Sequence, residues 1–228
     1  MSFSGFPADT LAFLEDLATN NNRSWFEANR SRYENSVLLP AISLIESMQK
    51  PLAKLAPCLL ADPRKVGGSL MRIYKDTRFS KDKTPYKTNI GIQFRHQAGK
   101  DVHAPGIYVH LQPGECFLGA GVWRPGPAAL LSIRSFIRDE SASWRRVVGN
   151  KAFGETFSFY DDALKSVPRG FDKSDPMIEY LRQKSFIALS PLSEKQIRKA
   201  SLVDDLCGGI RTARPLMLQL CQALDLAY

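Results

Sequence analysis

Hydrophobic residues recur at helical spacing near both ends of the chain and alternate with polar residues in the middle. In the first third, Leu11, Leu14 and Leu17 form an apolar stripe that predicts an amphipathic helix. The expected helices of this region cover residues 7–19, 23–35 and 36–55, the last of them interrupted at Pro40 and Pro51. Residues 56–68 contain two prolines and two glycines and are predicted to form a loop.

The middle of the chain predicts antiparallel strands with one buried face, because apolar and polar residues alternate with a period of two. The expected strands cover residues 70–74, 89–95, 106–112 and 115–123. Pro113 and Gly114 predict a turn between the last two strands. If Gln112 pairs with Glu115, an apolar face results in which Ile107, Val109 and Leu111 lie opposite Ala120, Leu118 and Cys116. A longer loop would shift this pairing but not the division of faces within each strand.

The second face of these strands is polar, aromatic and rich in glycine. Its predicted members are Asn89, Gly91, Gln93, Arg95, Tyr108, His110, Phe117, Gly119, Gly121 and Trp123. Glycine weakens a strand and often marks close approach of a ligand or of another backbone. This face is therefore interpreted as the floor of a ligand site, or else as a solvated face with glycine bulges or a face covered by a helix. Arg72 joins it if Met71 and Ile73 pack into the core.

Helical spacing returns in the last third. Helices are expected over residues 127–139, 141–148, 176–182, 193–207 and 214–227, with a loop over 165–175 and a strand over 185–189. Ser193 and Gln196 fit a capping box at a helix start, and Gly208–Gly209 is predicted to end that helix. No change of composition marks a linker. We therefore predict one α+β domain over residues 1–228, with a mainly antiparallel central sheet flanked by N-terminal and C-terminal helices.

Charge adds a preference for anions to this picture. The net charge of +8 comes entirely from residues 64–100, which include ten basic residues and only two acidic ones, Asp76 and Asp82. Such a local excess attracts phosphates, nucleotides, nucleic acid or an acidic surface, although a solvated basic loop has the same composition. The chain has no apolar run long enough to span a bilayer, no basic start typical of a signal peptide, and four widely spaced cysteines. A cytoplasmic, reducing location is the default expectation.

The basic segment has a further pattern, Arg72-Ile-Tyr-Lys-Asp-Thr-Arg-Phe-Ser-Lys-Asp-Lys-Thr-Pro-Tyr-Lys87. It resembles the signature of a widespread bacterial family of conserved hypothetical proteins, a domain of unknown function. The similarity extends to Phe3–Phe6, Trp25-Phe26, Asn29-Arg30, Tyr33, Tyr108–His110, Gly119–Pro125, Leu164-Lys165, Pro168–Phe171 and Leu181–Ser185. The resemblance implies family membership but no activity. Lys75 stands where the family often has arginine, which keeps the charge but not bidentate recognition.

The candidate ligand-binding residues combine the basic segment with the second face. They are Arg72, Lys75, Arg78, Lys83, Lys87, Tyr108, Gly119, Gly121 and Trp123. His110 and Asp76 are the candidate proton carriers, although the first is equally a surface histidine and the second a salt-bridge or turn residue. We expect no metal, because His96, His103 and His110 share no helix face, and no cofactor, because Gly119-x-Gly121 lacks a third glycine. The cysteines are predicted to be packing residues.

The residue pattern reveals no reaction, so whether the protein is an enzyme stays open. The favoured hypothesis is a site for a phosphorylated or carboxylated small molecule on the basic, glycine-floored sheet face, with or without catalysis. The second is single-stranded nucleic-acid binding, because aromatic residues are interleaved with cations in the basic segment. The third is a non-catalytic module that binds an acidic protein partner. No membrane partner is expected.

Overall fold

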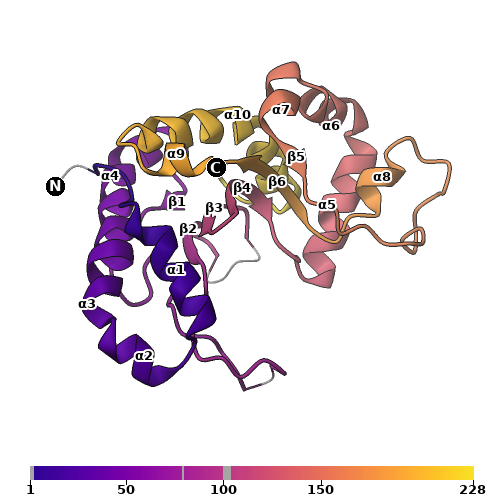
Figure 1. Cartoon of the computed structure of the whole chain (residues 1–228). Helices are drawn as coiled ribbons and strands as arrows, with labels where there is room; N and C mark the ends of the chain where they lie inside the picture. The colour runs from indigo at the N-terminus through magenta and orange to yellow at the C-terminus, as the bar shows by residue number, and fades with distance from the viewer. Residues whose placement is uncertain (1–2, 79, 100–103) are drawn as a thin grey trace.

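The computed structural model describes residues 3–78, 80–99 and 104–228, so His103 lies outside the described residues. Figure 1 shows a central sheet with α1–α4 on one side of the view, α5–α8 on the other and α9–α10 above. The helical segments are α1 (Asp9–Thr19), α2 (Arg23–Ala28), α3 (Arg30–Tyr33), the π-helical η1 (Glu34–Leu38), α4 (Leu39–Leu55), α5 (Pro127–Asp139), α6 (Ser141–Val148), α7 (Lys151–Thr156), α8 (Ile178–Leu181), α9 (Glu194–Ile197) and α10 (Leu202–Ala223). The predicted α+β class with flanking helices is confirmed.

The sheet has six strands in the order β1-β2-β3-β4-β6-β5, and every neighbouring pair is antiparallel. The strands are β1 (Leu59–Leu60), β2 (Ile90–His96), β3 (Gly106–Gln112), β4 (Glu115–Val122), β5 (Ser158–Phe159) and β6 (Phe186–Pro191). Gln112 pairs with Glu115 across the turn, which confirms the predicted register. Gly114 has a φ of +76°, a value that glycine adopts without strain, and this allows the short turn.

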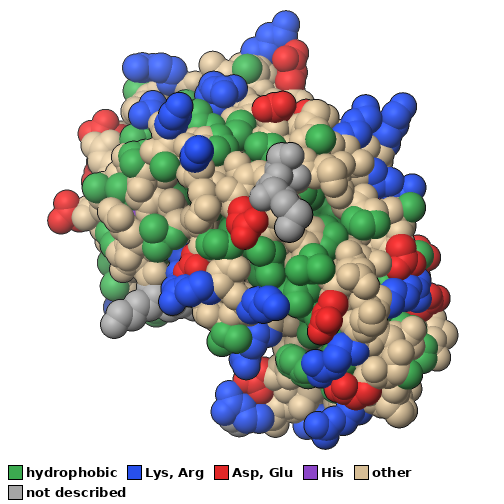
Figure 2. Space-filling model, turned by 90° about the vertical axis from the view of Figure 1, so that its left-hand side faces the viewer, with side chains coloured by type: hydrophobic (Ala, Val, Ile, Leu, Met, Phe, Trp, Pro, Cys, Tyr) green, Lys and Arg blue, Asp and Glu red, His purple; other side chains and the backbone are tan. Residues whose placement is uncertain are grey.

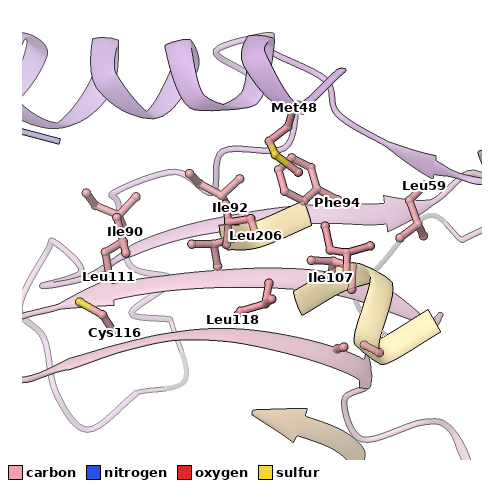
Figure 3. Close-up of a cluster of buried hydrophobic side chains, with 14 of the residues drawn as sticks. Met48, Leu59, Ile90, Ile92, Phe94, Ile107, Leu111, Cys116, Leu118 and Leu206 are labelled. Carbon is pink, nitrogen blue, oxygen red and sulfur yellow. The ribbon is translucent and has the colours of Figure 1, made fainter. Parts of the chain in front are cut away.

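One face of the sheet, here called the core face, carries the apolar half of each alternating strand. Ile92, Phe94 and Val109 on this face are completely buried. Figure 3 shows Met48 of α4 and Leu206 of α10 packed over these strands, together with the side chains of β2, β3 and β4. The period of two thus places an apolar surface under two amphipathic helices, and burial of this surface is the main driving force for the fold.

The N-terminal helices differ from the prediction at their boundaries. The expected helix over residues 23–35 is divided at Asn29, and the helical path continues through η1 into α4. Pro40 does not interrupt this helical path. It cannot donate to the Ser36 carbonyl four residues earlier, and that carbonyl accepts a hydrogen bond from the Thr10 hydroxyl instead. Pro51 lies inside α4, which the prediction had interrupted there. The predicted loop over 56–68 contains the short strand β1.

The predicted strand over residues 70–74 is wrong. This segment makes only two isolated bridges, Leu70 with Ile92 and Tyr74 with Tyr86. β1 pairs with the end of β2 that contains Arg95 and His96. Residues 70–74 pair with the same edge of β2 only near Ile92. Ile73 is buried as expected, but Met71 is only partly buried.

The C-terminal helices are also divided differently. The capping box of Ser193 and Gln196 is present, but α9 ends at Ile197 and α10 begins only at Leu202. Gly208 and Gly209 lie inside α10 and do not end it. A Cβ atom at Gly209 would lie 2.4 Å from Cδ2 of Leu118, so this glycine lets α10 approach the sheet closely. Of the helices in the described part of the chain, none is long and apolar enough to cross a membrane.

Candidate functional site

The face of the sheet opposite the core face holds a cavity of about 490 Å³. This volume is within the usual range for small-molecule sites. The lining residues come from β2, β3, β4 and β6 and from three positions outside the strands. They are Met71, Gln93, Gly106, Ile107, Tyr108, His110, Glu115, Phe117, Gly119, Ala120, Gly121, Trp123, Tyr160, Ile187 and Leu189. We call this side of the sheet the cavity face.

Three glycines of the cavity face differ in what a side chain at their position would contact. A Cβ atom at Gly91 would lie 2.6 Å from Oη of Tyr108, so any side chain there would displace the tyrosine. Gly121 has a φ of +138°, and a Cβ atom there would lie 1.9 Å from the backbone oxygen of Phe186. Gly119 is different, because a Cβ atom at this position would make ordinary contacts with Leu189 and Tyr108. Gly121 is therefore required by the backbone, whereas Gly119 could accept a small side chain without a clash.

Aromatic residues form one end of the cavity. The ring of Trp123, directly after β4, lies 5.3 Å from the ring of Tyr160 between centroids. Arg124 has a φ of +41°, and its guanidinium lies 5.2 Å from the Trp123 ring centroid. The Arg124 N–H donates a hydrogen bond to Oγ of Ser185. An unusual backbone conformation at a turn is thus held by neighbouring contacts and orients the tryptophan.

The other end of the cavity is polar. Oη of Tyr108 lies 3.2 Å from Nδ1 of His110, and Nε2 of His110 lies 3.4 Å from Oε1 of Gln112. The Gln112 oxygen can only accept a hydrogen bond. These contacts therefore fit a neutral imidazole that carries its proton on Nε2 and accepts a hydrogen bond from the Tyr108 hydroxyl at Nδ1. The His110 ring also stacks on Phe117, with centroids 4.7 Å apart.

Burial keeps both members of this polar pair uncharged near neutral pH. Desolvation lowers the pKa of His110 below its ordinary value, against smaller opposing effects of Gln112 and Glu115. Desolvation also raises the pKa of Tyr108 to about 12. The pair therefore offers hydrogen-bonding groups and a proton path between two rings, and it carries no fixed charge.

The predicted basic residues lie elsewhere. Among the described residues, the cavity lining contains neither lysine nor arginine. Lys75 forms an ion pair with Asp82, Arg78 forms one with Asp76, and Nζ of Lys83 donates to the Thr77 carbonyl. Arg72 is exposed and Lys87 is half-buried. The structure thus separates the predicted site into a cavity with Tyr108, His110, Gly119, Gly121 and Trp123, and a basic segment outside it.

Asp76 has the structural role that the sequence offered as an alternative to proton transfer. Its carboxylate accepts hydrogen bonds from the Arg78 side chain and from the Arg78 backbone N–H. These bonds lower the pKa of Asp76 to about 2. The carboxylate therefore stays ionised at neutral pH, and it is absent from the cavity lining.

The remaining candidates for chemistry are packing residues. All four cysteines, Cys58, Cys116, Cys207 and Cys221, are buried thiols. His96 is buried at the end of β2, and its Nε2 lies 2.6 Å from the Ala227 carbonyl. Within the described ranges, no group of three or more His, Cys, Asp and Glu residues has a geometry that could hold a metal.

Ten lining residues were not among the predicted site residues, although two of them, Gln93 and Phe117, had been placed on the same face. The other eight are Met71, Gly106, Ile107, Glu115, Ala120, Tyr160, Ile187 and Leu189. Ile187 and Leu189 had a detectable signal, because alternation within the predicted strand over 185–189 places them together on one face. Tyr160 had none, since it follows a two-residue strand that the pattern did not indicate. Met71 was expected in the core and instead lies beside Gly91.

Comparisons with known proteins add the family. Searches of curated proteins and of solved structures found no match. The model of the conserved hypothetical protein family DUF2461 matches residues 9–218, which is nearly the whole chain and includes both the basic segment and the cavity face. This chain therefore belongs to the DUF2461 family, whose members are described as conserved hypothetical proteins.

Proposed function

We propose that the protein binds a small organic molecule in the cavity on the cavity face of its sheet. The observation that carries this proposal is the lining itself, in which aromatic and aliphatic walls surround a few convergent polar groups. A solvated face would not need the positive φ angles of Gly121 and Arg124, which shape the backbone at one wall of the cavity.

The distribution of side chains suggests an amphiphilic ligand. In the β3–β4 register, Tyr108 lies opposite Gly119 and His110 opposite Phe117, toward the turn, whereas Trp123 lies beyond the other end of β4. A ring or branched chain would pack against Trp123 and Tyr160, above Gly119. A hydroxyl, amide or carbonyl group would bond to Tyr108 and His110. An anionic ligand stays a prediction, and it would have to be held by hydrogen bonds or by cations outside the lining.

The test is a thermal-shift screen with aromatic alcohols, amides, carboxylates, sugar phosphates and nucleotides. A compound that binds only the folded state raises the melting temperature by mass action. Gly119→Leu should fill the cavity without a backbone clash, because the added Cβ would be 3.5 Å from Cδ2 of Leu189. Gly154→Leu is the matched control, since Gly154 lies on the exposed surface of α7 with no atom near its Cβ position.

The expected result is a compound that stabilises the wild type and Gly154→Leu but not Gly119→Leu. Stabilisation by carboxylates or phosphates alone would support the anionic ligand. The proposal is overturned if a stabilising compound acts equally on Gly119→Leu, or if no compound in any class shifts the melting temperature.

A further inference from the structure

A basic hairpin, here residues 72–78 and 80–87, projects from the molecule and contributes no described residue to the cavity lining. Its two arms are joined by the Tyr74–Tyr86 bridge and by backbone hydrogen bonds from Lys75 to Pro85 and from Lys87 to Ile73. Figure 1 shows this segment extending beyond α2 at the bottom of the view. Its described residues contain six cations, Arg72, Lys75, Arg78, Lys81, Lys83 and Lys87, against the two acids Asp76 and Asp82.

The base of the hairpin is firmly attached to the helices. Tyr86 is buried and stacks on Phe26 with ring centroids 4.1 Å apart. The Asn21 side chain donates to the Tyr86 carbonyl and accepts from its N–H, at 2.9 and 3.1 Å. A fixed base means that the charges of the hairpin are held at a defined place on the surface.

An aromatic side chain is exposed at this base. Tyr74 packs 5.4 Å from Tyr86 between ring centroids, yet 49% of its surface remains accessible. The charged group of Arg30, in α3, lies near Tyr74, and those of Arg23 and Arg30 lie near Tyr86. Arg30 pairs with Glu27 on the exposed surface, where an ion pair contributes little and can exchange for another anion. Cations of α2 and α3 thus lie near the aromatic base of the basic hairpin.

We propose that the basic hairpin, with Arg23 and Arg30, binds single-stranded nucleic acid, the cations contacting phosphates and Tyr74 stacking on a base. An extended array of cations around a ring matches a polymer with repeated phosphates and flat bases. The two ion pairs within the hairpin neutralise only two of its six cations, and the carboxylates of both pairs are exposed. Lys and Arg side chains are also present elsewhere, and on the side shown in Figure 2 a group of them lies in the upper left of the view.

The experiment measures fluorescence anisotropy of a labelled oligothymidine of about 16 nucleotides, the upper end of usual site sizes. Salt is varied from about 50 to 200 mM, because each phosphate contact contributes to the salt dependence of the affinity. The variants are Arg72→Ala with Lys81→Ala, Lys81→Ala alone, Tyr74→Leu and Tyr74→Phe. The matched charge control is Lys173→Ala with Lys184→Ala, two exposed positions in the segments that flank α8. Circular dichroism checks the fold of each variant.

The Arg72/Lys81 variant should bind about tenfold more weakly, with its salt slope reduced by about two, and Lys81→Ala alone should reduce the slope by about one. Tyr74→Leu should lose about tenfold and Tyr74→Phe almost nothing, since the ring does the stacking. The Lys173/Lys184 control should change affinity less than about twofold. Gly119→Leu should bind as the wild type does, which separates this proposal from the cavity ligand.

Several results would overturn the proposal. One is the lack of any oligonucleotide binding at the lowest salt concentration. Another is an equal loss in the Lys173/Lys184 control, which would indicate bulk charge only. Duplex DNA bound as tightly as the single strand would exclude the stacking role of Tyr74, and polyglutamate bound as tightly as the oligonucleotide would point to an acidic protein instead.

Discussion

The core face and the cavity face are built from the same strands, and they differ in what each side chain contacts. On the core face, residues such as Ile92 and Phe94 are completely buried beneath α4 and α10. On the cavity face, Phe117 and Tyr108 are only partly buried, and glycines stand where strands usually carry larger residues. Glycine inside a strand costs about 0.5–1 kcal/mol relative to alanine, so this face is not optimised for stability.

This difference indicates which side chains stabilise the fold and which line the cavity. Side chains on the core face contribute through burial, whereas those on the cavity face leave a hollow between aromatic rings and polar groups. A face that gives up stability in this way is typical of binding sites, where the cost is offset only when a ligand is present. The two faces should therefore respond differently to the same substitution.

The largest contrast is expected from removing one phenylalanine from each face. Phe94→Ala empties a completely buried position and should lower the free energy of unfolding by about 3–5 kcal/mol. Phe117→Ala removes a partly exposed ring and should cost about 1 kcal/mol. Denaturant unfolding followed by circular dichroism measures both. Equal losses would show that the cavity face is as important for stability as the core face.

The next contrast lies within the cavity face, between its two β4 glycines. Gly121→Ala combines an unfavourable φ of +138° with a Cβ atom 1.9 Å from the Phe186 oxygen. It should destabilise the fold by about 3 kcal/mol. Gly119→Ala has neither problem and should change the free energy of unfolding by about 0.5 kcal/mol or less, with stabilisation the expected direction. Thermal and urea unfolding of both variants test this order, and a well-folded Gly121→Ala protein would contradict it.

The same contrast explains which parts of the fold the sequence could predict. The register of β3 and β4 was predictable, because a one-residue slip would turn Ile107, Val109 and Leu111 away from the core. The continuity of α10 was not, because local propensity favours a helix end at Gly208–Gly209. The close contact of Gly209 with Leu118 depends on where the helix meets the sheet, and no local pattern carries that information.

The candidate site was likewise predictable only in part. Alternation placed Tyr108, His110, Gly119 and Gly121 on one face, and the structure brings them together in the cavity. Arg72 was joined to this face by the expectation that residues 70–74 form a strand, and the other basic residues were added because they follow it in the same positively charged segment. Residues 70–74 make only isolated bridges, so charge and cavity are separate features. Tyr160 reaches the cavity from a loop, which strand periodicity cannot foresee.

The smallest expected effect is a pH dependence of folding stability that arises from His110 on the cavity face. Desolvation lowers the pKa of folded His110 below its ordinary value of 6.5. Above that value His110 is neutral in both states, so its titration makes no contribution to the pH dependence of stability. As the pH falls from 6.5 toward the lowered pKa, the unfolded chain takes up the proton first, and stability decreases until the folded state is protonated as well.

His110→Gln should therefore flatten the decrease in urea midpoint below about pH 6.5, a change smaller than either of the two above. Gln112→Ala removes a hydrogen bond that raises the His110 pKa, so it should extend the decrease to lower pH. An NMR titration of the His110 ring gives the folded pKa directly. A value at or above 6.5 would mean that the ring is better solvated than its stacking on Phe117 implies, and that the polar end of the cavity carries charge near neutral pH.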